Sequence, residues 1–462
     1  MDSKINIISK YIIIVLFLFS LYIGFSQSDN IYLWDEAVYL STAENLFSSN
    51  PYYSEIDYRP PLLPFLLKTG SFFIEIELAA KLIVSLFFSF GVLGIYLLAN
   101  QTHNKKTGLI ASILFIASLF LQHSSSQLMT DIPSTTLIIF CFYFLLKKED
   151  KKNTGKNFLY SGLFMGLAIL MRFTSAVFFV LVLAFLYLKK KDMKLIYKYL
   201  VFTLIPMMPY LIWAQLTQKF ALMPFIKAQV IIAGSGAVGG LTYYLNAIYV
   251  AGGIVSIIGL ILYVFHLKNF NKKEFLQKDV FFVLWAFFLI LYLTINPHKE
   301  IRYILPAMPA VFILAGIGFS QFKDKWINIF TAIVFCFALL YPLSNVGFFD
   351  GTHDIGEATM INRSQSIYGC SEYISKNIPQ DRVIYSHSLY PVIAYYTKKN
   401  CIATWPWDEK FYEKFPQNMP HKAWYIHFTD INKEPNQEWL DSDKHFTKLK
   451  EFENIIIYEY DI

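Results

Sequence analysis

Ionisable residues stand beside aromatic and apolar segments in several short stretches of the sequence. The stretch "LWDEAVY" sets Asp35 and Glu36 among aromatic residues, and "LMTDIPSTTLIIF" sets Asp131 at the start of an apolar run. A carboxylate that is partly removed from water has a raised pKa and is a better general base. The alternatives are solvated loop charges for the first pair and a helix cap for Asp131.

A third stretch, "NPHKEIRYILPAMPA", concentrates charge between two apolar runs. Ionisable groups in such a position indicate a functional site by default, and arginine together with lysine can clamp a phosphate. A charged turn without a function is the alternative. The stretch contributes His298, Lys299, Glu300, Arg302 and Tyr303.

Arg59, in "DYRPPLLPF", is a basic residue in an otherwise acidic segment. It either pairs with Asp57 at the surface, which contributes little, or acts as a second group that binds phosphate. Acids that deprotonate a hydroxyl and cations that hold a departing phosphate are what the transfer of a sugar from a lipid phosphate requires. The hydroxyl attacks the anomeric carbon through a transition state with oxocarbenium character, while charge grows on the leaving phosphate.

The composition indicates which elements must position these residues. The chain has 462 residues, of which 55% are hydrophobic, 18% aromatic and 16% charged, and its mean hydropathy is +0.42. These values are typical of a membrane protein. The net charge of +6 is spread over separate lysine-rich connections, which favours cytoplasmic loops and argues against nucleic acid as a partner. Those connections are 103–107, 147–156, 189–198, 266–278 and 322–326.

About eleven apolar segments are long enough to cross a bilayer. If the N-terminus is cytoplasmic, alternation places every lysine-rich connection on the cytoplasmic side. The first segment, Tyr11 to Phe25, lacks a small-x-small cleavage pattern and is interpreted as a retained helix rather than a signal peptide. We therefore expect a multi-pass protein of the plasma membrane. The segments are centred near residues 18, 88, 115, 139, 164, 181, 207, 256, 287, 312 and 335.

Two regions are expected outside the cell. The outer loop 28–77 contains Pro60, Pro61 and Pro64 and is predicted to form interfacial helices beside the transmembrane domain of residues 1–343. Residues 344–462 are predicted to form an extracytoplasmic α/β domain. Its strands are "DRVIYSHS", "NCIATW", "HKAWYIHF" and "NIIIYEY", and its helices are "SIYGCSEYISKNI" and "YPVIAYYTKK". Cys370 and Cys401 in this domain either form a disulfide or are free thiols.

At these residues the chain resembles the GT-C superfamily of polytopic glycosyltransferases that use polyprenyl-phosphate sugars. It is most similar to the branch that contains the protein O-mannosyltransferases and the lipid A aminoarabinose transferase. "WDEAVY" looks like the acidic pair after the first span of that family, and "YRPPLLPFLL" looks like its basic-residue-Pro-Pro element. "LMTDIPSTTLIIF" looks like its second outer acid, and "HKEIRY" is similar to the His-Lys-Glu-x-Arg-Phe element of related mannosyltransferases, with Tyr303 in place of Phe.

The resemblance implies an α-helical GT-C fold and a set of site residues. Asp35 would be the base or the acid of the acceptor site, with Glu36 and Asp131 as further catalytic candidates. Some members use a divalent cation such as Mg²⁺ or Mn²⁺ and others do not, so a metal on these three acids stays open. The resemblance gives Arg59 and Arg302 as the contacts to the donor phosphate. His298, Lys299 and Tyr303 are further candidates for phosphate binding, supported by Glu300.

We therefore predict a membrane glycosyltransferase. It would move a single sugar, mannose or another hexose or pentose, from a polyprenyl-phosphate donor such as dolichyl phosphate mannose to a lipid, glycan or protein acceptor on the outer face, with inversion. A transporter or lipid flippase is the main alternative, and it would place ionisable residues near span centres. A receptor or structural assembly protein is the second alternative, and it would not explain the functional groups of "HKEIRY" and "WDE".

Overall fold

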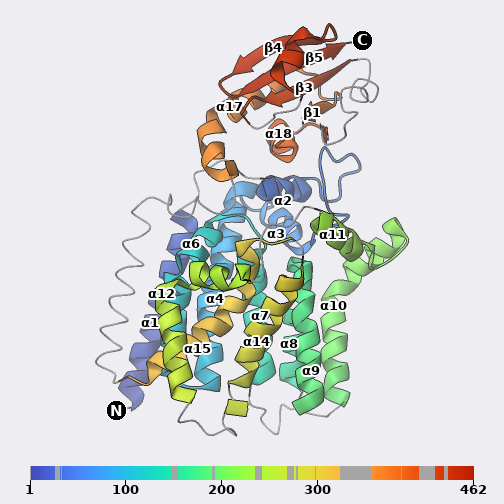
Figure 1. Ribbon diagram of the computed structural model, residues 1–462. Coiled ribbons are helices and arrows are strands. Elements are labelled where there is room, and N and C mark those ends of the chain that lie inside the picture. Colours follow the sequence, from blue (N-terminus) through green and yellow to red (C-terminus); the bar gives the residue numbers. More distant parts are fainter. Residues whose placement is uncertain are drawn as a thin grey trace. The chain divides into compact units, whose positions relative to one another are not determined.

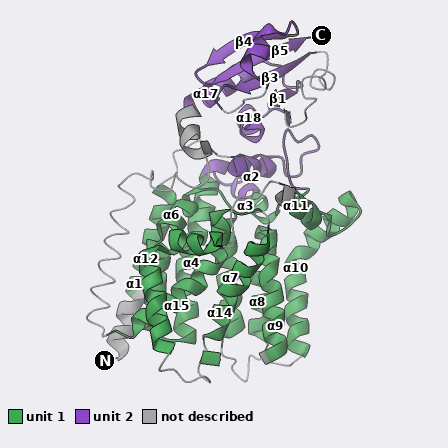
Figure 2. Cartoon of the chain, in the orientation of Figure 1, with its two compact units in different colours: residues 1–28, 57–66, 78–346 green, residues 29–56, 67–77, 347–462 purple. Residues whose placement is uncertain are grey.

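The computed structural model describes residues 2–26, 32, 34–147, 155–189, 193–234, 242–267, 275–276, 279–296, 298–322, 355–386, 388–404, 422–430 and 435–461. The described chain divides into two compact units (Figure 2). Unit 1 contains residues 1–28, 57–66 and 78–346, and unit 2 contains residues 29–56, 67–77 and 347–462. The predicted domain boundary at residues 343 and 344 lies outside the described residues.

Unit 1 is a bundle of helices (Figure 1). Its elements are α1 (Asp2–Ser26), the first part of α3 (Leu62–Gly70), most of α4 (Ile76–Thr102), α5 (Lys105–Ala117), α6 (Leu119–Ser126), α7 (Asp131–Leu146), α8 (Lys156–Met171), η1 (Phe173–Ser175), α9 (Ala176–Lys189), α10 (Met193–Gln218), α11 (Met223–Gly234), α12 (Tyr243–Leu267), α14 (Val280–Ile295), η2 (Ile301–Ala307) and α15 (Met308–Ser320).

Four stretches of helix are long and apolar enough to cross a membrane by length and composition, and α5 with α6 make a fifth if the pair, bent by 61°, is one span. Every predicted span centre except the last falls in a helix, and the last, near residue 335, lies outside the described residues. The number of spans stays a prediction, whereas the helical membrane fold is confirmed. The four stretches are Ile76–Thr102, Met193–Gln218, Tyr243–Leu267 and Ile301–Ser320.

Small residues let the helices of unit 1 approach closely. A side-chain carbon added at Gly162 of α8 would lie 2.5 Å from the carbonyl oxygen of Tyr199 in α10, and one added at Gly166 would lie 2.2 Å from that of Thr203. No real side chain fits at such distances. Close approach through small residues spaced four apart is a usual way in which membrane helices associate, and it fixes α8, which leads directly into the Arg172 turn.

An aromatic cluster fills the bundle beside η2. Trp285 of α14 is fully buried and packs edge to face against Phe142 of α7, with ring centroids 4.5 Å apart. Its indole nitrogen donates to the carbonyl oxygen of Pro306 at 2.8 Å. A buried Trp that satisfies its single donor in this way stabilises the position of η2, the element that carries Arg302 and Tyr303.

Unit 2 is built on a mixed five-stranded sheet (Figure 1). The strand order is β2-β1-β3-β5-β4; β1 pairs in parallel with β2 and β3, and β5 pairs antiparallel with β3 and β4. The register aligns Ile384 with both Cys401 and Trp424. The elements are α2 (Trp34–Glu44), the end of α3, α17 (Ile355–Asn377), β1 (Ile384–Ser386), α18 (Tyr390–Thr397), β2 (Cys401–Ala403), β3 (Lys422–Phe428), α20 (Gln437–Ser442), β4 (Phe446–Phe452) and β5 (Ile455–Asp461).

The predicted C-terminal α/β fold is confirmed: all four predicted strands and both predicted helices are present. The sequence analysis missed β4, because this edge strand buries few side chains and alternates only weakly in "FTKLKEF", and it missed the short α20. Cys370 and Cys401 are both buried and free, so the structure contains the two thiols rather than the disulfide. Burial raises the pKa of both thiols, which makes them unreactive.

Candidate functional site

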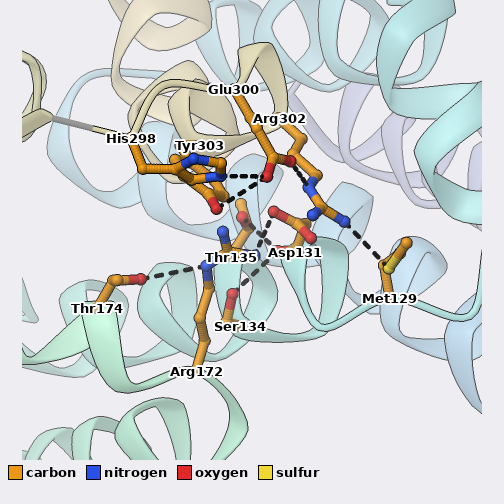
Figure 3. A network of polar contacts seen from close by, with 10 residues as sticks. All are labelled: Met129, Asp131, Ser134, Thr135, Arg172, Thr174, His298, Glu300, Arg302 and Tyr303. Atoms are coloured by element: carbon orange, nitrogen blue, oxygen red, sulfur yellow. Dashed lines mark hydrogen bonds and ion pairs between the residues drawn. The ribbon is translucent and has the colours of Figure 1, made fainter. Parts of the chain in front are cut away.

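The predicted site residues fall into two groups, one in each unit. Asp35 and Glu36 belong to unit 2, whereas Arg59, Asp131 and the 298–303 stretch belong to unit 1. Figure 3 shows the polar network of unit 1.

Asp131 is the first residue of α7 and is 2% exposed. The helix cap is therefore Thr130 rather than Asp131, and Pro133 lies in the first turn as expected. The hydroxyls of Ser134 and Thr135 donate to the backbone carbonyl of Asp131, while its carboxylate forms an ion pair with Arg172. The rigid start of the helix thus holds a buried acid that faces a guanidinium (Figure 3).

Arg172 is a central residue of this network that the sequence analysis did not include among the site residues. It ends α8, and the turn that follows is the short η1 before α9. Its Nε donates to the Thr174 hydroxyl at 3.1 Å, and its guanidinium lies 4.9 Å from the centre of the Tyr303 ring. An arginine in a turn between two apolar helices costs free energy, which indicates a function. This feature of the sequence could have identified Arg172 as a site residue.

Glu300 joins three neighbours from its own stretch. Its carboxylate pairs with Arg302, contacts the His298 ring nitrogen at 2.7 Å and accepts a hydrogen bond from the Tyr303 hydroxyl at 3.0 Å. Burial alone would raise the pKa of Glu300, but the charge of Arg302 and the contact with His298 outweigh it and hold the pKa well below its ordinary value. Glu300 is therefore an ionised anchor for the cations around it.

Arg302 is the residue of the network best suited to bind an anion. Its side chain is 26% exposed, compared with 13% for Arg172. One of its terminal nitrogens, Nη1, lies 3.3 Å from the sulfur of Met129. A thioether is a weak acceptor, so a phosphate oxygen would form a much stronger, charge-assisted bond with the same nitrogen. The two carboxylates of Asp131 and Glu300 are matched by the two guanidiniums of Arg172 and Arg302.

Lys299 and Arg59, which were also predicted to bind phosphate, make other contacts. The ammonium group of Lys299 is buried and donates to the carbonyl oxygens of Thr294 and Asn296, at 3.0 and 2.8 Å, near the end of α14. It therefore closes this helix end. Arg59 is partly exposed, and its backbone carbonyl accepts from the hydroxyl of Tyr210 in α10, at 3.4 Å. This contact ties the segment before α3 to the helix that follows α9.

In unit 2, Asp35 and Glu36 occupy the first turn of α2. Asp35 is partly exposed, whereas Glu36 and all the residues that follow it up to Ala43 are buried. Acidic side chains in the first turn interact favourably with the helix dipole. The turn therefore presents one accessible carboxylate beside one buried carboxylate at a defined position.

Clusters of acidic, His and Cys side chains can hold a metal ion. Within the described part of the chain, no three side chains of His, Cys, Asp or Glu gather closely enough to hold a metal ion. Asp131, the metal candidate of unit 1, faces a guanidinium instead. A metal held by Asp35, Glu36 and Asp131 stays a prediction, since these acids belong to different units.

The fold and a family match together define the class of the protein. Residues 58–213, about a third of the chain, match the family model described as dolichyl-phosphate-mannose-protein mannosyltransferase. This segment contains Arg59, Asp131 and Arg172. No curated protein matches the chain. With the helical fold, the match indicates a multi-pass membrane glycosyltransferase of the GT-C type.

Solved structures share this fold over nine tenths of the chain or more. ArnT from Cupriavidus metallidurans bound to undecaprenyl phosphate superposes with a TM-score of 0.72 at 15% identity, covering 99% of this chain and 98% of that one. The oligosaccharyltransferase AglB from Archaeoglobus fulgidus, in complex with an inhibitory peptide and a dolichol-phosphate, gives a TM-score of 0.63 at 11% identity, covering 91% of this chain and 70% of that one. At these identities the likeness concerns the fold.

Proposed function

We propose that the protein transfers a single sugar from a polyprenyl-phosphate donor to a lipid, glycan or protein acceptor on the outer face of the membrane. The observation that carries the proposal is the position of Arg302, held by Glu300 with one guanidinium nitrogen on the Met129 sulfur. The matched family and the ArnT and AglB structures, whose descriptions name lipid phosphates, support the same class of donor.

The proposed reaction assigns each group a role by its chemistry. A nucleophilic group of the acceptor, a hydroxyl in the simplest case, attacks the anomeric carbon, and its proton passes to the carboxylate of Asp35 or Glu36. The bond between the anomeric carbon and the phosphate oxygen breaks, and the electron pair leaves with the lipid phosphate. Attack from the face opposite the phosphate inverts the anomeric centre.

The cations stabilise the leaving group. Arg302 binds the phosphate as negative charge grows on it, and this contact replaces the one with Met129. Tyr303 and His298 hold Glu300, which in turn orients Arg302. Preorganised cations of this kind act in a partly dry site, where they are worth more than in water. Arg59, from the matched segment, is proposed as a second contact to the phosphate.

The proposed orientation follows from the charge distribution. The N-terminus and the lysine-rich connections face the cytoplasm under the positive-inside rule, which places the carboxylates of α2 and the 298–303 stretch on the opposite side. A lipid donor made in the cytoplasmic leaflet would then have to be moved across before it is used.

A turnover assay tests this function. Purified protein in detergent is incubated with a radiolabelled polyprenyl-phosphate hexose and candidate acceptors, and the release of polyprenyl phosphate is measured for wild type, Asp35→Asn and Arg302→Ala. We expect turnover in wild type and its loss in both variants, which must elute as folded protein. Arg302→Lys, which keeps the charge but loses the forked geometry, should retain a fraction of the activity.

Two outcomes contradict the proposal. If wild type releases no lipid phosphate from any polyprenyl-phosphate sugar, a transporter or flippase becomes the better interpretation. If both variants turn over at the wild-type rate, the activity resides on other residues.

A further inference from the structure

Two helices of unit 2 that are far apart in the sequence lie against each other, α2 and α18. The two helices contact each other at both ends. At their beginnings, the rings of Trp34 and Tyr390 pack edge to face with centroids 4.8 Å apart. At their ends, the ammonium group of Lys398 bonds to both carboxylate oxygens of Glu44, at 2.7 and 2.6 Å. The two helices therefore run in the same direction and are joined at both ends.

Further polar contacts surround this joint. The hydroxyl of Tyr52 also donates to the carboxylate of Glu44, and the ammonium group of Lys398 lies 3.7 Å from the centre of the Tyr395 ring. The hydroxyl of Tyr396 accepts from the backbone nitrogen of Tyr32, two residues before α2, at 3.1 Å. The bond between Tyr32 and Tyr396 joins the segment before α2 to α18, whereas the other two contacts hold Glu44 and Lys398, the two partners of the ion pair.

The sheet makes α18 a rigid support. The helix is the crossover between the parallel strands β1 and β2, and a backbone bond from Ile384 to Asn400, at 2.9 Å, closes the connection beside it. Both residues that flank α18, Leu389 and Lys398, have a φ of 55°, in the left-handed region. Non-glycine residues in that region cost free energy and persist where the surrounding structure holds them.

The left-handed backbone at Lys398 accompanies a contact between its side chain and α2. A left-handed residue after a helix turns the chain away from the helix axis, and here the side chain of that residue reaches Glu44. Glycine would provide the same turn with less strain, but it would provide no ammonium group. The choice of lysine at this position is explained by its bond to α2.

We propose that α18 is a positioning element for the acidic turn of α2, with Lys398 and Tyr390 as its positioning residues. The inference rests on the proposed function, in which Asp35 and Glu36 act on the acceptor. Tyr390 contacts Trp34, the residue directly before Asp35, and Lys398 fixes the opposite end of the same helix. The C-terminal α/β part of the chain thereby serves the reaction without touching the reacting atoms.

The test separates positioning from folding. Lys398→Met and Tyr390→Leu remove one joint each, and Lys398→Arg keeps the ion pair. Lys376→Met is the matched control, because Lys376 pairs with Glu372 within α17 and removal of that pair leaves α2 unaffected. For each variant, kcat and the KM for the polyprenyl-phosphate sugar are measured per folded molecule, together with hydrogen exchange of the α2 backbone amides.

We expect kcat to fall about tenfold in Lys398→Met and in Tyr390→Leu with little change in KM, because small misplacements of a reacting group lower the rate steeply. Exchange in α2 should become faster in both variants. Lys398→Arg should retain most of the activity, and Lys376→Met should behave as wild type. A merely structural role would lower the folded fraction and leave the kcat of the folded molecules unchanged.

The failure of this inference is distinguishable from that of the proposed function. If wild type turns over but Lys398→Met and Tyr390→Leu keep its kcat, α18 does not position the acids. If wild type gives no turnover at all, the proposed function fails, and unchanged exchange in α2 would then also overturn the joint between the helices.

Discussion

Carboxylates are held in different ways in the two units. In unit 1, Asp131 pairs with Arg172 and Glu300 pairs with Arg302, so each acid has a guanidinium partner. In unit 2, Asp35 and Glu36 stand at the start of α2, and the helix that carries them is fixed through the contacts of Trp34 and Glu44 with α18.

The difference indicates different tasks. An acid that is ion-paired to arginine is a poor base, because the cation stabilises its charged form, but it fixes the cation in a defined position. Asp35 and Glu36 have a defined geometry because they lie in the first turn of α2, where Asp35 is partly exposed. We therefore propose phosphate binding for the network of unit 1 and proton transfer for the α2 turn.

The largest expected effect concerns the α2 acids. Asp35→Asn or Glu36→Gln should lower kcat by about 10²–10⁴-fold, the usual contribution of a general base, in the lipid-phosphate release assay. The variant with the larger effect identifies the base. Asp131→Asn should raise KM for the donor more than it lowers kcat, and a loss of kcat in Asp131→Asn equal to that in the α2 variants would contradict the distinction between the units.

The next effect concerns the stability of the network in unit 1. Arg172→Met leaves the buried carboxylate of Asp131 without its guanidinium, and breaking a buried pair from one side costs about 3–5 kcal/mol. The double variant Asp131→Asn/Arg172→Met should recover part of this loss in the free energy of unfolding, measured in detergent. If the double variant is no more stable than Arg172→Met alone, the ion pair is not what Arg172 contributes to the fold.

The smallest effect concerns pH. Because the pKa of Glu300 is lowered in the folded protein, its carboxylate stabilises the folded state at pH values above the ordinary pKa of 4.5. That contribution is lost as the pH falls from there through the lowered pKa. Glu300→Gln should therefore be less stable than wild type by about 1–3 kcal/mol near neutral pH, the range of a hydrogen bond to a charged group.

Thermal unfolding of both proteins between pH 7 and pH 3 measures this effect. The difference in stability should be constant above pH 5 and shrink below about pH 4. A difference that stays constant down to pH 3 would show that the charge of Glu300 does not stabilise the network.

Much of the fold was predictable from hydrophobic pattern. Long apolar runs must form helices in a bilayer, because their backbone groups find no other partners there, and the predicted centres fall in helices for that reason. The strands around Ile384, Tyr425 and Ile456 were predictable from short apolar runs between turn residues. The edge strand β4 was not, because lysine and glutamate cover its exposed face.

The candidate site was predictable in its residue types but not in its pairings. The clustering of His298, Glu300 and Arg302 is visible in the sequence, since the three lie within five positions. The partner of Asp131 is not, because Arg172 is 41 positions away and the approach depends on how α7 and α8 pack. The contacts of Lys299 were not predictable either. Its charge predicted a contact with phosphate, and in the structure its ammonium group donates to carbonyl oxygens at the end of α14.

The sequence by itself determined the membrane class, the helices and the chemistry of the acidic and basic stretches, because composition and local periodicity are enough to decide which segments leave water. Only the tertiary structure decided which acid pairs with which cation and that α18 holds α2. Those contacts join residues as far apart as Glu44 and Lys398, and a local pattern carries no information about them, because they depend on the packing of whole helices against one another.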